Sequence, residues 1–125
     1  MNKDLEDFTN GCIEALYFTE TGDCDQPESD AVMDEDSLLR LKADCHSWWG
    51  RFGCYVMSDA CVCKEEGVSK AISAGRDFWY TRNHHGVGFW DGDWSGNYAD
   101  ILTNGSACYG EISVTEGDDG KIYII

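Results

Sequence analysis

The chain has 125 residues, of which 24 are Asp or Glu and nine are Lys or Arg, so its formal net charge at pH 7 is -15. This length predicts one domain with a single core, and a hydrophobic content of 42% is too high for a disordered acidic tail. The scarcity of cations argues against direct binding to nucleic acid or to an anionic membrane surface, and no stretch is apolar enough to span a bilayer.

The amino-terminal sequence MNKDLEDFTNGC has no apolar core of the kind that a signal peptide needs. The chain contains seven cysteines, an odd number. Together these features favour reduced thiols in a cytoplasm over a framework of disulfides. We therefore expect a cytoplasmic protein.

Three helices are expected in the first 75 residues. Apolar side chains in residues 5–16 follow the i, i+3/i+4 spacing of one buried helix face. Residues 19–35 form an acidic connector, which we expect to be an exposed loop. A second helix, capped by Asp36 or Ser37, should continue to about Met57. A short third helix is expected over residues 65–73, ending at Gly75.

The second half of the chain predicts strands. Residues 77–82 and 87–90 are aromatic and β-prone, and the sequence NHHG between them suits a hairpin turn. After a turn at residues 91–96, Asn97 can cap a helix that runs to about Cys108. Residues 111–115 and 121–125 should form a final hairpin.

This order of elements predicts a single α+β domain over residues 1–125. Its acidic helical part, residues 1–73, would pack on a small antiparallel sheet made of two C-terminal hairpins within residues 74–125.

The predicted first hairpin concentrates aromatic residues. They form either a platform that binds another protein or, as the pattern favours, part of the core, because alternation along a strand buries about half of such rings. The aromatic residues are Phe78, Trp79, Tyr80, Phe89, Trp90 and Trp94.

Two clusters have residue types that can bind metal or support hydrolysis. The first is His84, His85, Asp91 and Asp93, whose spacing matches neither an EF-hand nor HExxH. The second is Cys54, Cys61 and Cys63 with Cys45 or His46, which lacks the usual CxxC pairs of structural zinc sites. Exposed turn residues and buried thiols explain both clusters more simply. We expect no catalytic residues, metal or cofactor.

The most distinctive sequence feature is an acidic run between Glu20 and Asp36, which contains eight acidic residues and no basic ones. Carboxylates spaced in this way can take the place of phosphates in the basic channel of a nucleic-acid enzyme, whereas the ordinary alternative is a solvated loop. The candidate partner-binding residues are Glu20, Asp23, Asp25, Glu28, Asp30, Asp34, Glu35 and Asp36.

The stretch AGRDFWYTRNHHGVGFWD at residues 74–91 resembles a pattern of small acidic phage and prophage proteins, GxDFWxTRNGHGxGFWDR. YGE at residues 109–111 and DDGKIY at 118–123 match the ending of the same pattern. The chain differs at His84 and Gly92, where the pattern has glycine and arginine, and a histidine held at positive φ would carry an energetic cost.

The resemblance implies a phage or mobile-element origin, although it implies no chemistry. By analogy with small acidic phage proteins, it favours an inhibitor of host defence, such as an anti-CRISPR or antirestriction protein. The expected partner is a basic, nucleic-acid-binding host protein or complex. Residues 1–63 hold 14 acidic and four basic residues, so this half should carry most of a DNA-mimicking surface.

Overall fold

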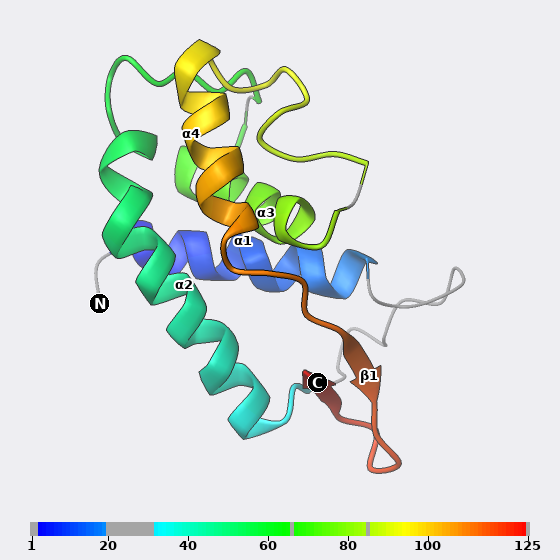
Figure 1. The fold of residues 1–125 in the computed structure, drawn as a ribbon. Coiled ribbons are helices and arrows are strands. Elements are labelled where there is room, and N and C mark those ends of the chain that lie inside the picture. The colour runs from blue at the N-terminus through cyan, green and yellow to red at the C-terminus, as the bar shows by residue number, and fades with distance from the viewer. Residues whose placement is uncertain (1–2, 20–31, 66, 85, 125) are drawn as a thin grey trace.

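The computed structural model describes residues 3–19, 32–65, 67–84 and 86–124. It contains α1 (Lys3–Thr19), α2 (Glu35–Val56), α3 (Lys70–Arg82) and α4 (Gly96–Ala107), followed by β1 (Val114–Glu116) and β2 (Ile122–Ile124). In Figure 1, α1 and α3 lie side by side, and the hairpin extends from the opposite end of the molecule to α4. The predicted α+β class is confirmed.

None of the helices in the described part of the chain has the length and apolar character needed to cross a membrane.

The first two helices are confirmed, with a change at one boundary. In α1, Phe8, Cys12 and Leu16 are buried on one face, as their spacing predicts. The cap of α2 is Asp34, earlier than the expected Asp36 or Ser37, and its carboxylate accepts a hydrogen bond of 3.1 Å from the Ser37 backbone N–H.

The predicted helix over residues 65–73 and the strand over residues 77–82 are both wrong. One helix, α3, replaces them: its cap is Ser69, whose hydroxyl accepts a hydrogen bond from the Ile72 N–H. Ala71, Ala74 and Phe78 are spaced at i, i+3 and i+7 and are buried against the rest of the core. Tertiary packing thus overrides the β propensity of the aromatic residues.

The predicted strand over residues 87–90 is also wrong, because these residues form a loop, so the sheet in the described part of the chain contains one hairpin instead of two. β1 and β2 pair antiparallel with Thr115 opposite Tyr123, which confirms the predicted final hairpin. Met33, just before α2, forms a parallel bridge to Ile122. This bridge ties the C-terminal hairpin to the chain that leads into α2.

Two glycines allow α1 and α3 to pack with their backbones in contact. A Cβ atom at Gly11 would collide with the backbone of Ile72, and one at Gly75 would collide with the Phe8 carbonyl. Gly75 was expected to stop a helix. Instead, it lies inside α3 and is required for the close approach of the two helices.

Stacked aromatic rings fill the core between the helices. The Trp48 ring lies between those of Phe8 and Phe89, with ring centroids 4.7 Å and 5.7 Å away. The Trp48 indole N–H donates a 3.1 Å hydrogen bond to Ser106 on α4. α4 itself begins at Gly96, with Ser95 at the cap position in place of the expected Asn97, and ends one residue before Cys108.

Arg82 at the end of α3 is a buried cation with a complete set of partners. Its side chain is 1% exposed and forms a 2.9 Å ion pair with Asp44 on α2. The guanidinium also donates to the backbone carbonyls of Tyr109 and Gly110 at 3.0 Å and 2.9 Å. It therefore joins α2, α3 and the segment that follows α4.

Candidate functional site

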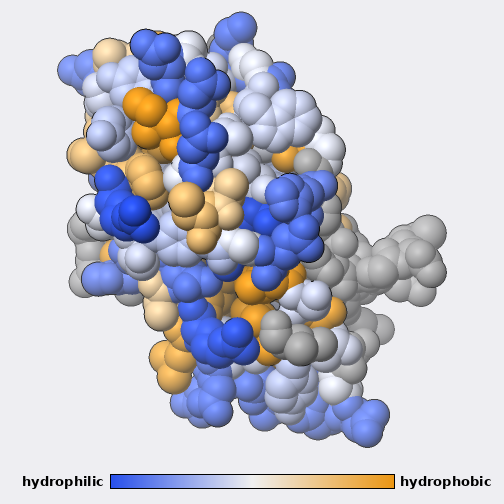
Figure 2. All heavy atoms as spheres, viewed as in Figure 1, coloured by the Kyte–Doolittle hydropathy of each residue, from blue (hydrophilic) through white to orange (hydrophobic). Residues whose placement is uncertain are grey.

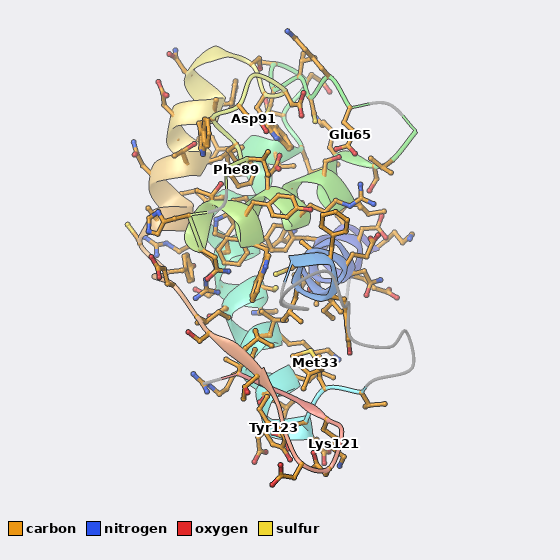
Figure 3. The ribbon with its side chains drawn as sticks, turned by 90° about the vertical axis from the view of Figure 1, so that its right-hand side faces the viewer. Met33, Glu65, Phe89, Asp91, Lys121 and Tyr123 are labelled. Atoms are coloured by element: carbon orange, nitrogen blue, oxygen red, sulfur yellow. The ribbon has the colours of Figure 1, made fainter. Side chains whose placement is uncertain are left out.

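A cavity of about 750 Å³ opens between α1, α3 and the loops on either side of α3. In Figure 3, two of its residues, Glu65 and Asp91, lie on loops beside α3, at the opposite end of the molecule from the hairpin. We call this cavity the acidic pocket. Its lining residues are Ile13, Glu14, Ala15, Tyr17, Phe18, Glu65, Arg76, Asp77, Tyr80, Val87, Asp91 and Asp93.

The acidic pocket contains five carboxyl groups and one guanidinium. Arg76 pairs with Glu14 at 3.1 Å and with Glu65 at 3.0 Å, so it joins α1 to the segment before α3. Ser73 also donates a 2.8 Å hydrogen bond to Glu65. The one cation of the pocket is therefore held by these two glutamates.

The remaining three carboxyl groups have no basic partner among the described residues. Asp91 accepts a 3.3 Å hydrogen bond from the Gly88 N–H, and Asp77 accepts one of 2.7 Å from the Trp94 indole N–H. Asp93 is exposed at the pocket. Because these three Asp residues line one cavity without a basic partner in the described part of the chain, the local potential is negative.

Asp77 is the residue of the pocket most affected by this environment. Its pKa is raised to about 7, mainly by burial and also by the charges of Asp91, Asp93 and Glu65, whereas the Trp94 hydrogen bond lowers it. A carboxyl group perturbed in this way within a cavity is a candidate functional group.

The other wall of the pocket is apolar and partly open to solvent. Ile13, Tyr17 and Phe18 contribute from the second half of α1, and Val87 from the loop after α3. Phe18 is 66% exposed and Val87 is also exposed. Figure 2 shows that apolar groups form separate small areas on the face that it displays, among hydrophilic residues.

The structure divides the predicted histidine–aspartate cluster. Asp91 and Asp93 both line the acidic pocket, whereas His84 lies 3.2 Å from Glu111 and is not part of the lining. His85 lies outside the described residues. Within the described ranges, no group of three or more His, Cys, Asp or Glu side chains is placed to hold a metal ion.

The predicted cysteine site is also not assembled. Cys45 is buried beside Cys12, and the hydrogen bond between them, together with burial, raises the pKa of Cys12. Burial raises the pKa of both Cys61 and Cys63 as well, which disfavours the thiolate that metal binding and nucleophilic attack require. Cys54 is exposed.

The acidic run lies mostly outside the described residues, which include only its last three members. Asp34 caps α2, and Glu35 and Asp36 occupy the first turn of that helix, where negative charge is stabilised by the helix dipole. The other five, Glu20, Asp23, Asp25, Glu28 and Asp30, are not described. In the sequence, Glu20 follows two residues after Phe18 of the acidic pocket.

Most of the aromatic cluster belongs to the core. Phe78, Trp79, Phe89 and Trp94 are buried, whereas Trp90 is 54% exposed. The interpretation of these rings as core is therefore confirmed for four of the six, although they reach it from a helix and a loop instead of a hairpin.

No protein-family model, curated protein or solved structure matches this chain. The interpretation of the site therefore depends on its own residues. Sequence reasoning found Asp91 and Asp93 but missed Glu14, Glu65 and Asp77. The spacing of residues 73, 76, 77 and 80 on one helix face would have indicated the position of Asp77, had residues 77–82 been assigned to a helix.

Proposed function

We propose that this chain is a phage-encoded, non-enzymatic inhibitor of a host protein or complex that binds nucleic acid, such as a restriction enzyme or a CRISPR effector. It would act in the host cytoplasm, by presenting carboxylates to a basic channel that normally holds phosphates. The observation that carries the proposal is the charge of the described surface, where exposed Asp and Glu residues outnumber exposed Lys and Arg residues by twelve to six.

Six of the nine Lys and Arg side chains make contacts within the protein. Lys3, Arg76 and Arg82 form ion pairs with carboxylates. Arg40 and Lys70 donate to backbone carbonyls, and Arg51 lies over the Phe52 ring. The contacts of Arg40, Lys70, Arg76 and Arg82 join different segments of the chain and reduce the number of cations available to bind a polyanion.

Exposed carboxylates outnumber exposed cations in the described part of the chain, where six Lys and Arg residues are exposed. Twelve of the Asp and Glu residues whose burial is described are exposed. A surface of this kind steers a basic partner toward it and repels nucleic acid. The carboxylates of the acidic run would add to the same negative field and account for part of the formal charge of -15.

The resemblance to phage proteins supports the choice of partner. The pattern over residues 74–91 and its ending at residues 109–111 and 118–123 favour a mobile-element origin, in which defence complexes are the basic nucleic-acid-binding targets to be blocked. The structure adds a reason for the glycine of that pattern at position 84, because His84 has a φ of 57°.

The test is a pull-down with purified restriction enzymes and CRISPR effectors, followed by competition with target DNA. The chain should displace DNA, and its affinity should fall as salt is raised. Changing Glu20, Asp23, Asp25, Glu28 and Asp30 to their amides should weaken binding, because it removes five negative charges from the acidic run. These changes leave the residue that caps α2, Asp34, intact.

A matched variant controls for net charge. Glu6, Asp59, Asp100, Glu111 and Asp118 are exposed residues elsewhere in the chain, and changing these five to amides alters the charge equally. If both variants weaken binding to the same extent, the acidic run has no special role. Binding that leaves DNA occupancy unchanged would contradict the mimic mechanism.

A second candidate function is a protein-interaction module that uses its remaining exposed aromatic surface. The observation that favours it is the exposure of Trp90, since exposed tryptophans are frequent anchors of interfaces. Trp90→Ala should then abolish partner binding without changing the circular dichroism spectrum, and substitutions in the acidic run should have little effect.

A further inference from the structure

We propose that the acidic pocket binds an arginine side chain of the protein partner. This inference rests on the proposed function, because a basic partner supplies the arginine. It adds a defined recognition site to a general negative surface. The cavity, its uncompensated carboxyl groups and its apolar wall each support this assignment.

The size and openness of the cavity fit a side chain with its flanking backbone. A volume of about 750 Å³ lies within the range of small-molecule sites. The lining comes from α1, from Glu65, from α3 and from the loop at residues 87–93. A ligand in the pocket would therefore touch four segments that the fold already holds together.

The polar wall lacks a cation for three of its carboxyl groups. Arg76 is taken by Glu14 and Glu65, and no described Lys or Arg forms an ion pair with Asp77, Asp91 or Asp93. These groups are not arranged to share a metal ion, since no metal-binding group occurs among the described residues. Spread carboxylates of this kind suit an extended organic cation with several donors.

The apolar wall distinguishes arginine from smaller cations. Arginine carries an aliphatic stem that can pack on Ile13 and Val87, and a planar guanidinium that stacks on aromatic rings. The rings of Tyr17, Phe18 and Tyr80 line the same cavity. Because Phe18 is 66% exposed, covering it would also remove apolar surface from water.

The protonation of Asp77 provides an independent signature of this binding. Its pKa of about 7 reflects burial without a cation. An arriving guanidinium would favour the ionised form, so binding should release a proton and strengthen as the pH rises from 6 to 8. The other groups facing it are Glu14, Cys63, Glu65, Arg76, Tyr80, Asp91 and Asp93.

Two of those neighbours are titratable groups with raised pKa values. The pKa of Cys63 is raised above 9.0 and that of Tyr80 above 10.0, in both cases mainly by burial, so neither thiol nor phenol ionises between pH 6 and 8. Asp77→Asn should therefore remove most of the pH dependence of binding over this interval.

The experiment measures binding of blocked Gly-Gly-Arg-Gly-Gly peptide to the full chain by NMR titration. A peptide with citrulline in place of arginine is neutral and has nearly the same shape. The arginine peptide should bind about tenfold more tightly, because it carries the charge that the pocket lacks. The NMR signal of the Trp94 indole N–H, which donates a hydrogen bond to Asp77, should shift on binding.

Matched variants localise the effect. Asp93→Asn should weaken the arginine peptide about three- to tenfold, whereas Asp100→Asn, an equal change at an exposed site outside the pocket, should not. Phe18→Ser should weaken it more than Leu39→Ser, since both residues are exposed but only Phe18 lines the cavity.

Several results would overturn the inference. They are equal affinity for the arginine and citrulline peptides, equal effects of Asp93→Asn and Asp100→Asn, or tighter binding of spermidine than of the arginine peptide.

The proposed function has a separate readout. Displacement of DNA that survives Asp93→Asn and Phe18→Ser would remove the pocket from the mechanism while the inhibitor function remained. Selective arginine binding without displacement of DNA would leave the pocket assignment and contradict the inhibitor.

Discussion

The two faces of α3 differ in whether a buried charged side chain has a partner of opposite charge. On the core face, Arg82 is almost fully buried and has Asp44 and two backbone carbonyls as partners. On the pocket face, Asp77 is also largely withdrawn from water, but its hydrogen bond comes from a neutral indole and its charged neighbours include three carboxylates. Both residues belong to the same 13-residue helix.

This difference indicates which face is structural. A buried ion with all its partners joins elements together and is costly to disturb. A buried acid without a cation reduces stability once it ionises, and such local costs are typical of functional sites. The comparison therefore identifies the acidic pocket as the place where the fold is not optimised for its own stability.

Removing the buried arginine should have the largest effect. Arg82→Ala should lower the free energy of unfolding by about 3 to 5 kcal/mol, because it leaves Asp44 and two carbonyls without their donor. Urea denaturation measures the loss. Arg76→Ala on the pocket face should cost about 1 kcal/mol or less, because the Arg76 side chain is 27% exposed, against 1% for Arg82, so that water screens its ion pairs. Equal losses would break the distinction between the faces.

Neutralising the buried acid should stabilise the protein at high pH. The folded-state pKa of Asp77, about 7, lies above its ordinary value of 3.8, so the folded state binds more protons and stability falls as the pH rises between these values. Asp77→Asn should remove this loss and gain about 4 kcal/mol at pH 8, with little gain at pH 4. Thermal or urea unfolding across pH 4–8 tests this, with Asp100→Asn as control.

A parallel pH profile for Asp77→Asn and the wild type would contradict that prediction. It would mean that the carboxyl group is not perturbed by burial, and the contrast between Asp77 and Arg82 would disappear.

The close contact between α1 and α3 should be sensitive to a single methyl group. Gly75→Ala should cost about 2 kcal/mol, because the new Cβ collides with the Phe8 carbonyl. Gly50→Ala in α2 meets no atom within 4 Å and should instead stabilise by about 0.5 to 1 kcal/mol. Guanidinium denaturation of both variants makes the comparison. If Gly75→Ala left the free energy of unfolding unchanged, α1 and α3 would be able to separate slightly.

The smallest expected effect lies at the C-terminal end of α3. His84 has a φ of 57°, a conformation that glycine adopts without strain, so His84→Gly should gain about 0.5 to 1 kcal/mol. Its contact with Glu111 is exposed on both sides and should contribute little to stability. A loss in the melting temperature of His84→Gly would show that this contact matters more than the backbone strain.

Local sequence patterns determined the first two helices, α4 and the final hairpin. Leu5, Phe8, Cys12 and Leu16 specify one helix face by their spacing, and the DDG turn followed by alternating residues specifies the hairpin. The strand predicted over residues 77–82 was wrong because aromatic β propensity is weak, whereas burial of Ala74, Phe78 and Trp79 in the core is energetically larger.

The sequence by itself also determined the sign of the protein's electrostatics, because 24 acidic and nine basic residues leave a large negative excess in any fold. Only the tertiary structure decided which carboxylates lack a cation. Glu14, Glu65, Asp77 and Asp93 are distant in the chain and meet in one pocket because Gly11 and Gly75 allow α1 and α3 to touch. Pairing and desolvation depend on distances of a few ångströms, which no spacing along the sequence specifies.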